Sequence, residues 1–395
     1  HRDLHSFPTR RSSDLIMNFY SEEHELVRNT ARKFAEKHLK PGVIERDENA
    51  EFPFEQVKMM GELGFMGIMV PEKWNGAGMD TISYTLIIEE LSRVDASAGV
   101  IVSVNNSLVC QIIVNYGNDW QKETYLKKLA GGRQLGAFSL SEPQSGSDAS
   151  NLHTVAEKSG QYYIINGTKN WVTSGINSDV VIVMALTDKS AGYNGISTFI
   201  VPKDLDGFLV GQKEDKLGIR GSDTCELYFD NCRIPIENLI DKEGQGFRIA
   251  LATLDGGRIG IAAQALGIAQ AALDKSVQYA KERKQFGKTI GSFGALQEKI
   301  AIMGTNVEAS RLLIQKAAIL KDAHKPYTKA AAMAKSFASQ TAMDAAIDCV
   351  QIFGGYGYMQ EYGVERLMRD AKITQIYEGT TEIQQMVIAR EIMEN

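Results

Sequence analysis

The sequence predicts an α+β protein in three parts: an N-terminal helical domain, a middle β domain built as a barrel or sandwich, and a C-terminal helical bundle. Three observations support this prediction. Helical patterns occupy the chain up to about residue 133, short strand-like runs alternate with turns up to about 238, and long helical patterns with short connections follow. We therefore expect domains at 17–133, 134–238 and 239–395.

The segment before the first domain does not fit this plan. Residues 1–16 show neither helical nor strand periodicity and begin with histidine, whereas Met17 opens a regular pattern. We interpret 1–16 as an extraneous, disordered segment outside the fold. A targeting peptide is the alternative, given its arginines and serines, but its two aspartates and the lack of an amphipathic face argue against it.

Helix signals follow in the N-terminal part. Ser21 is a candidate N-cap with acidic residues in the first turn after it, and Pro41-Gly42 ends that helix. A second helix is expected from Phe54 to Leu63, where Gly64 stops it. Further helices are expected at about 81–93, 96–116 and 119–130.

Near Gln134 the pattern changes to strands. Asn166-Gly167 and Asp206-Gly207 are turn dipeptides that we place between strands. Strands do not alternate with helices here, which argues against a dinucleotide-binding sheet. The expected strands lie at 136–140, 152–157, 161–165, 179–187, 195–201, 208–211 and 224–230.

The C-terminal part is helical again. A nearly unbroken pattern from Gly246 to Arg283 predicts one very long helix, and further helices are expected at about 293–323, 327–352, 363–374 and 381–393. Long helices with short loops are typical of a bundle.

Composition limits the class of function. The net charge of −6 argues against a general nucleic-acid binder, because neutralising phosphates needs a basic surface. The four cysteines are scattered without metal-ligand or disulfide spacing, so we expect no metal site and a reducing compartment. We find no apolar run that approaches the roughly 20 residues of a membrane span.

The strongest catalytic candidate lies near the C-terminus. Residues 376–384 are expected to hold a helix end, a tight turn and a new helix, in which Gly379 takes a positive φ and Thr380 or Thr381 caps the next helix. Glu378 is then a carboxylate fixed just before a helix N-terminus, where it can act as a base. The competing interpretation is a solvated glutamate that serves the helix dipole, and spacing alone favours it.

Other polar segments can bind a ligand. Phe138 to Asp148 closes the first strand with hydroxyls and exposed N–H groups, and Trp171 follows with an aromatic plane beside hydroxyls. Arg283 ends the longest helix, and two glycines follow Gln351 to Phe353 at the end of another. Each also has an ordinary explanation: a β-turn, a core tryptophan, a C-terminal cation and a helix C-cap.

Together these segments resemble the acyl-CoA dehydrogenase family, and within it the short-chain, butyryl-CoA type. The resemblance covers Met17 to the C-terminus. Its motifs stand in matching order: Leu140-Ser141-Glu142-Pro143 with Gly146-Ser147-Asp148, Trp171-Val172-Thr173, Lys216 to Gly221, Arg283 with Phe286-Gly287, Gln351 to Gly355, and Ile376 to Thr380.

The resemblance implies a fold, an assembly and an activity. The C-terminal domain is expected to be a four-helix bundle, and the protein a homotetramer arranged as a dimer of dimers. FAD is expected between the β domain and the bundle, with its adenine end against a neighbouring subunit. The implied reaction converts short-chain acyl-CoA to trans-2-enoyl-CoA and passes electrons to electron-transferring flavoprotein. The implied location is the cytoplasm, or the mitochondrial matrix in a eukaryote, with no membrane or nucleic-acid partner.

The resemblance also implies roles for residues. Glu378 matches the base that takes the α proton while the β hydrogen leaves as hydride to flavin N5, and burial should raise its pKa. In branched- and long-chain members the base stands instead at the position of Gly257. The implied cofactor contacts are Phe138, Leu140, Ser141, Gly146, Ser147, Trp171, Thr173, Arg283, Phe286, Gln351, Gly354, Gly355, Thr380 and Glu382, and the implied substrate contacts are Ser147, Asp255, Arg258 and Gly379. Of these, Arg283 and Gln351 to Gly355 match contacts donated across a subunit interface.

Some positions depart from the family pattern. Gly294 stands where a glutamine usually contacts the cofactor, so FAD is held less tightly unless Gln297 compensates. Gln144 and Ser145 replace smaller residues in the flavin loop, which puts its flexibility in question. Trp74-Asn75 stands where the family more typically has an aromatic-glycine pair near the substrate, and the effect on chain-length preference stays open.

Two alternative functions remain. Acyl-CoA oxidases share the fold and the base but are usually much longer than this chain. A non-catalytic, DNA-binding flavoprotein of the same fold should carry a basic patch, and the net charge and Glu378 argue against it.

Overall fold

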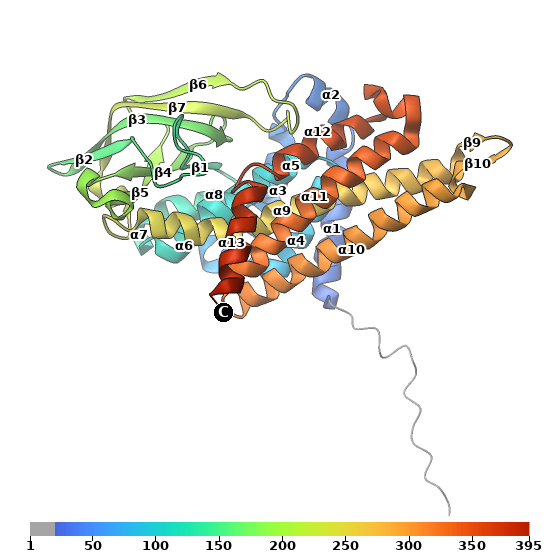
Figure 1. Ribbon diagram of the computed structural model, residues 1–395. Helices are drawn as coiled ribbons and strands as arrows, with labels where there is room; N and C mark the ends of the chain where they lie inside the picture. The colour runs from blue at the N-terminus through green and yellow to red at the C-terminus, as the bar shows by residue number, and fades with distance from the viewer. Residues whose placement is uncertain (1–19, 395) are drawn as a thin grey trace, which may run out of the picture.

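A computed structural model describes residues 20–394 and shows the three expected parts (Figure 1). Some of the short N-terminal helices lie behind the bundle and others beneath the β domain, which forms one end of the molecule, and the long helices run away from it. The predicted fold class is confirmed. The segment 1–16 lies outside the described residues, and the exact domain limits stay a prediction.

The first helix begins as its sequence signals indicate. Ser21 caps α1 (Glu22–Phe34): its hydroxyl accepts from the His24 N–H at 3.2 Å, and the His24 ring accepts from the Ser21 N–H at the same distance. A short helix that we did not predict, α2 (Val43–Glu48), starts after Gly42 with φ of 73°. The remaining N-terminal helices are α3 (Phe54–Glu62), α4 (Thr81–Ser92), α5 (Ala96–Val104), α6 (Gln111–Tyr116), α7 (Asp119–Gln121) and α8 (Lys127–Ala130).

One continuous helical stretch corrects the expectation about apolar length. Residues Ala96–Tyr116 form 21 residues that are long and apolar enough to cross a membrane, the one such helix in the described part of the chain. However, 89% of its apolar window is buried inside the protein. It contacts α4, α9 and β1, so this stretch is a core helix.

The β domain is one hydrogen-bonded sheet in the order β6-β7-β3-β2-β4-β5-β8, with β1 beside β4. Its two halves meet at β2, which joins β4 through the single pair Val155 and Leu186. Asp206-Gly207 lies in a turn as predicted. Asn166-Gly167 does not, because both residues lie within β3 at a register shift. The strands are β1 (Gly136–Ser139), β2 (Val155–Ser159), β3 (Tyr162–Thr173), β4 (Val180–Leu186), β5 (Ile196–Pro202), β6 (Phe208–Lys213), β7 (Thr224–Pro235) and β8 (Leu239–Ile240).

The long helices lie close to the predicted ranges. Small residues let them pack tightly: a Cβ on Gly267 of α9 would lie 2.4 Å from the Glu89 carbonyl oxygen of α4. The hairpin of β9 (Lys284–Gln285) and β10 (Lys288–Thr289) forms the far tip of the bundle (Figure 1). The helices are α9 (Gly246–Glu282), α10 (Gly294–Asp322), α11 (Thr328–Phe353), α12 (Val364–Thr374) and α13 (Thr381–Met393).

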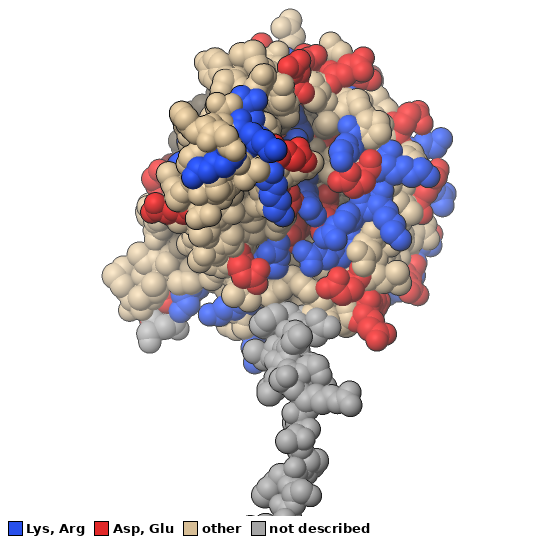
Figure 2. Space-filling model, turned by 90° about the vertical axis from the view of Figure 1, so that its right-hand side faces the viewer, with Lys and Arg blue, Asp and Glu red and all other residues tan. Residues whose placement is uncertain are grey.

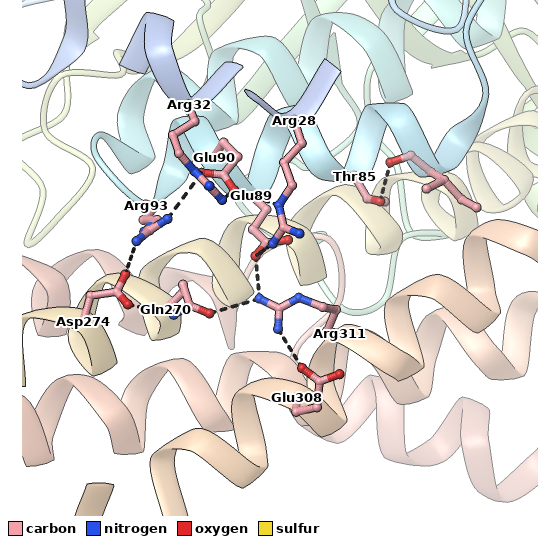
Figure 3. A network of polar contacts seen from close by, with 11 residues as sticks. Arg28, Arg32, Thr85, Glu89, Glu90, Arg93, Gln270, Asp274, Glu308 and Arg311 are labelled. Atoms are coloured by element: carbon pink, nitrogen blue, oxygen red, sulfur yellow. Dashed lines mark hydrogen bonds and ion pairs between the residues drawn. The ribbon is translucent and has the colours of Figure 1, made fainter. Parts of the chain in front are cut away.

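A buried polar network ties the N-terminal domain to the bundle (Figure 3). Glu89 and Glu90 of α4 are each 2% exposed. Arg28 and Arg32 of α1 donate to Glu90 at 3.0 and 2.9 Å, and Arg311 of α10 donates to Glu89 at 2.7 Å. Buried carboxylates are stable only when they are paired, so this network fixes α4 between α1 and α10.

The molecular face at the hairpin end of the bundle carries charges of both signs. Figure 2 shows lysine and arginine side chains interspersed with aspartate and glutamate. This face is therefore not the uniformly basic surface that a nucleic-acid backbone requires.

Candidate active site

Glu378 occupies a strained turn between α12 and α13. Its φ of 53° lies in the left-handed region, and Gly379 follows with φ of 93°. The positive φ of Gly379 was predicted, whereas that of Glu378 was not. Thr380, rather than Thr381, caps α13, and its side chain accepts from the Ile383 N–H at 3.4 Å. A left-handed glutamate costs about 1–3 kcal/mol and needs surrounding contacts that hold it.

Two side chains hold the carbonyl groups of this turn. The Gln384 amide donates to the Glu378 carbonyl at 3.3 Å and to the Gly379 carbonyl at 3.0 Å. The Lys335 ammonium of α11 donates to the Gly379 carbonyl at 2.5 Å. Gln384 and Lys335 are both 0% exposed, so the turn is fixed from inside the bundle.

The residue before Glu378 is anchored to the long helix α9. The Tyr377 hydroxyl donates to the Gln264 side-chain oxygen of α9, and the Gln264 amide donates to the Ala96 carbonyl at 2.9 Å. These contacts connect the turn to α9 and α5.

The Glu378 carboxylate lies against α9 where that helix has no side chain. A Cβ on Gly257 would lie 2.1 Å from Glu378 Oε2 and 2.8 Å from Leu108 Cδ2. A glycine is thus required at this point of α9. The position that holds the base in other members of the resembled family here makes room for Glu378.

Burial gives this carboxyl the properties of a base. Its Oε2 atom is enclosed and has no hydrogen-bond partner among residues 20–394. Burial raises the pKa of Glu378 to about 7, while the positive charges of Lys335 and Arg258 act to lower it. A carboxyl with a pKa near neutral, aimed into the protein, is suited to proton abstraction.

The predicted substrate residues lie partly beside this turn. Arg258 follows Gly257 on α9 and pairs with Asp255 at 2.5 Å. Asp255 also accepts from the Thr328 hydroxyl at 2.6 Å, and burial raises its pKa above the ordinary value. Ser147 lies on an exposed loop of the β domain, and the described contacts do not connect it to Glu378. Substrate binding by these residues stays a prediction.

A buried ion pair shapes the loop after β1. Lys169 of β3 and Glu142 are 0% and 3% exposed and pair at 2.7 Å, and Lys169 also donates to the Leu140 carbonyl at 3.0 Å. Glu142 accepts from the N–H groups of His153 and Thr154 at 2.6 and 3.1 Å. Sequence reasoning missed Lys169 as the organiser of this loop, because the strand was expected at 161–165 and left Lys169 outside it, whereas β3 continues to Thr173.

The end of β3 presents an aromatic surface that fits a planar cofactor ring. Trp171 has a φ of 58° and is 62% exposed, at a register shift between Lys169 and Val172. A left-handed φ is a genuine outlier for such a bulky residue and points to function. Ser139 Oγ and Asn170 Oδ1 nearby in the sheet are enclosed without a hydrogen-bond partner in the described part of the chain. An exposed indole beside polar groups matches the chemistry of a flavin ring.

The other predicted cofactor residues are distributed over the loop and the start of α13. Leu140 is 8% exposed, whereas a Cβ on Gly146 would meet no atom within 4 Å. Phe138, Ser141 and Thr173 are partly buried, Ser147 is exposed, and Thr380 and Glu382 lie at the N-terminus of α13.

A second group of predicted cofactor residues gathers at the far end of the bundle. Arg283, Gly354 and Gly355 line a cavity of about 420 Å³, and the Arg283 guanidinium lies 5.4 Å from the centre of the Tyr356 ring. Phe286 is 92% exposed, and Gln351 is exposed at the end of α11. At 1.5 Å per residue, α9 separates Arg283 from Gly257 by about 39 Å. Within one chain, this group therefore does not share a site with Glu378.

The departures noted in the sequence have structural counterparts. A Cβ on Gly294 would meet no atom within 4 Å, and the Gln297 amide is engaged with the Gly291 carbonyl at 3.0 Å. The Gln144 amide donates to Glu142 at 2.7 Å and so stiffens the loop. Trp74 lies under the ammonium groups of two lysines, 5.0 and 5.7 Å from its ring.

A helical bundle that encloses a carboxylate of raised pKa, joined to a β domain with an exposed aromatic platform, fits the class of flavin-dependent dehydrogenases. The models of the acyl-CoA dehydrogenase N-terminal, middle and C-terminal domains match residues 21–133, 137–232 and 244–393. The chain belongs to the acyl-CoA dehydrogenase family, whose members are flavin-dependent oxidoreductases. The predicted family and enzyme class are confirmed.

Two relatives show how close the similarity is. The chain is 50% identical to a short-chain specific acyl-CoA dehydrogenase of Clostridium acetobutylicum over 94% of this chain and 98% of the relative. It is 48% identical to the mitochondrial short-chain specific acyl-CoA dehydrogenase of Rattus norvegicus, over 94% of this chain and 90% of the relative.

Two solved structures share the fold. A chain from the structure of the electron transferring flavoprotein of Acidaminococcus fermentans, described as a step towards a mechanism of flavin-based electron bifurcation, is 50% identical with a TM-score of 0.94. Butyryl-CoA dehydrogenase from Megasphaera elsdenii is 46% identical with a TM-score of 0.93. Each similarity covers 95% of this chain and 99% of the other.

Proposed function

We propose that this protein dehydrogenates short-chain acyl-CoA thioesters at the α and β carbons to give trans-2-enoyl-CoA, with Glu378 as the base. The observation that carries the proposal is the Glu378 turn. Its carboxylate is enclosed, lacks a hydrogen-bond partner among the described residues and has a pKa of about 7. The resemblance of the motif and the names of the relatives supply the substrate class.

In this proposal, different residues of the chain take the proton, polarise the thioester and hold the cofactor. Glu378 takes the α proton, and the N–H of the same turn can polarise the thioester oxygen, which makes the α proton more acidic. In this proposal the acceptor of the β hydride is N5 of bound FAD, which is the chemistry that the cofactor supplies. Trp171, Thr173 and the loop from Leu140 to Ser147 would hold the ring, and Arg283 with Gly354 would hold the diphosphate and adenine.

The space around the base supports a short acyl chain. One helical turn beyond Gly257, a Cβ on Gly260 would lie 2.1 Å from the Tyr84 hydroxyl and 2.5 Å from Ser103 Oγ. These two hydroxyls bond each other at 2.8 Å and fill the space beside α9. In this proposal the acyl chain runs from Gly257 toward Gly260, where a long alkyl chain would have to displace this buried pair at the cost of two unsatisfied hydroxyls.

The assembly also belongs to the proposal. Because Arg283 lies about 39 Å along α9 from the base, we expect it to serve the cofactor of another subunit in a homotetramer built as a dimer of dimers. Electron-transferring flavoprotein is the proposed acceptor, supported by the similarity to a chain in the Acidaminococcus structure. Relatives come from bacteria and from mitochondria, which fits either proposed location, cytoplasm or matrix.

An anaerobic titration with butyryl-CoA tests this function. Purified wild-type protein should show flavin absorbance that bleaches on adding the thioester. Glu378→Gln should keep the flavin absorbance and the fold but lose bleaching by at least about 10³-fold in rate, because no other base replaces the carboxylate. A wild-type protein without flavin, or a Glu378→Gln variant that bleaches at the wild-type rate, would contradict the proposal.

A further inference from the structure

Lys335 is an unusual residue for the middle of a helical bundle. It lies within α11, is 0% exposed, and its ammonium donates to the Gly379 carbonyl at 2.5 Å. A buried ammonium costs several kcal/mol unless it gains strong interactions, and this partner is a neutral carbonyl. Stability alone would favour an aliphatic residue at this position.

The contact of Lys335 falls on the catalytic turn. Gly379 directly follows Glu378, whose left-handed φ of 53° has to be maintained by surrounding contacts. Gln384 of α13 also donates to the Gly379 carbonyl, at 3.0 Å. The turn is therefore held by one charged and one neutral side chain at the same oxygen.

The charges around the carboxylate single out Lys335. Glu378 faces two positive groups, Lys335 of α11 and Arg258 of α9. The charge of Arg258 is largely balanced by Asp255 at 2.5 Å. Lys335 also faces the positive charge of Arg258 and the carboxylate of Glu382 on α13, and Glu378 is the strongest of these three electrostatic partners.

The ionisation states are compatible with this pairing. Burial lowers the pKa of Lys335 to about 8 and raises that of Glu378 to about 7. In the window between these values, the ammonium and the carboxylate are both present. Each charge then stabilises the other in a region of low dielectric constant.

We propose that Lys335 is the positioning residue of the catalytic turn: it holds the Gly379 carbonyl in place, and its positive charge keeps Glu378 ionised and ready to accept a proton. The proposal rests on the role of Glu378 as the base. Lys335 itself touches the turn and not the reacting atoms.

Three variants separate charge from anchoring. Lys335→Met removes both the charge and the hydrogen bond, Lys335→Arg keeps the charge, and Gln384→Leu removes only neutral hydrogen bonds to the same turn. The holoenzymes are compared by the pH dependence of kcat/KM for butyryl-CoA. In parallel, the protonation of the Glu378 carboxyl is titrated by infrared difference spectroscopy, with Glu378→Gln as the spectral reference.

Only the loss of the Lys335 charge should move the midpoint of the Glu378 titration. Lys335→Met is expected to shift the acidic limb of kcat/KM and the infrared titration upward by about one pH unit, which lowers kcat/KM about tenfold below pH 6. Lys335→Arg should keep the wild-type midpoint. Gln384→Leu should lower kcat/KM at every pH without moving the midpoint.

The proposal fails if Lys335→Met leaves the midpoint unchanged, or if Gln384→Leu moves it as far. Should Lys335→Met not fold, Lys335→Gln carries the same test, because it keeps a donor for the Gly379 carbonyl and removes the charge. The infrared titration does not need turnover. A wild-type protein that does not dehydrogenate acyl-CoA would therefore refute the proposed function while the effect of Lys335 on Glu378 is still measured.

Discussion

The contact between Glu378 and α9 leads to a sharp prediction about Gly257. In Gly257→Ala, the new Cβ would lie 2.1 Å from Glu378 Oε2, whereas ordinary van der Waals contacts start at 3.4 Å. The carboxylate must therefore retreat by about 1.3 Å, unless α9 itself moves. A misplacement of about 1 Å at a reacting group costs on the order of 10²-fold in rate, so we expect kcat to fall by about that factor.

The same substitution should affect stability very little. Alanine is better than glycine in a helix interior by about 1 kcal/mol, which offsets part of the strain from Leu108, whose Cδ2 would lie at 2.8 Å. Gly256→Ala is the matched control on the same helix, because the nearest atoms to its Cβ lie at 3.9 Å. It gains the same helix propensity without a clash, and its effect on kcat should be at least tenfold smaller.

Steady-state dehydrogenation of butyryl-CoA and thermal unfolding of the flavin-loaded proteins measure both effects. A low kcat in Gly257→Ala together with a near-normal Tm would show that the carboxylate, and not the fold, was displaced. If Gly257→Ala turned over at the wild-type rate, the carboxylate would not use the space beside α9, and the assignment of the base geometry would be wrong.

Two further predictions concern stability. Burial raises the pKa of Glu378 in the folded protein to about 7, against an ordinary value of 4.5. Between pH 4.5 and 7 the folded state therefore keeps a proton that the unfolded state releases. The free energy of unfolding then falls as pH rises through this range. Above pH 7, Glu378→Gln should therefore be more stable than wild type by up to about 3 kcal/mol and should gain nothing near pH 4, as denaturant unfolding at both pH values would reveal. Glu142→Leu leaves Lys169 buried without its anion, so the free energy of unfolding should fall by about 3–5 kcal/mol and the protein should retain FAD poorly on gel filtration. The double variant Glu142→Leu with Lys169→Met should recover much of that stability. Equal loss of stability in the single and double variants would argue against the ion pair.

Periodicity predicted the elements well where local signals agree with tertiary packing. Ser21 supplied an N-cap for α1, and the apolar spacing after Gly246 gave nearly the full length of α9. The prediction of a turn at Asn166-Gly167 was wrong because β3 continues through both residues. Pairing with β7 stabilises an extended backbone there, and the register shift between Ile165 and Gly167 accommodates the glycine. Such long-range pairing is not encoded in the dipeptide.

At the candidate site, too, local motifs were readable from the sequence and long-range packing was not. Motif order predicted roles for Glu378, Trp171 and Arg283, but where these residues lie relative to one another depends on the packing of elements far apart in the sequence. The role of Gly257 as a gap for Glu378 needs the packing of α9 against the turn, 121 positions further along the chain. Lys335 was missed because a single lysine on a helical pattern looks like a solvated residue, and only its burial shows that it acts on the turn.

The length of α9 has a genetic consequence. If Glu378 of one subunit works with Arg283 of another, two different defective chains can repair each other. Glu378→Gln and Arg283→Ala proteins, each impaired alone, should regain activity when they are coexpressed, because a mixed pair contains one site in which both residues are intact. Random pairing of equal amounts would restore about a quarter of the sites. The catalytic unit would then be a property of the pair of chains, and coexpressed variants that stayed inactive would show that each chain completes its own site.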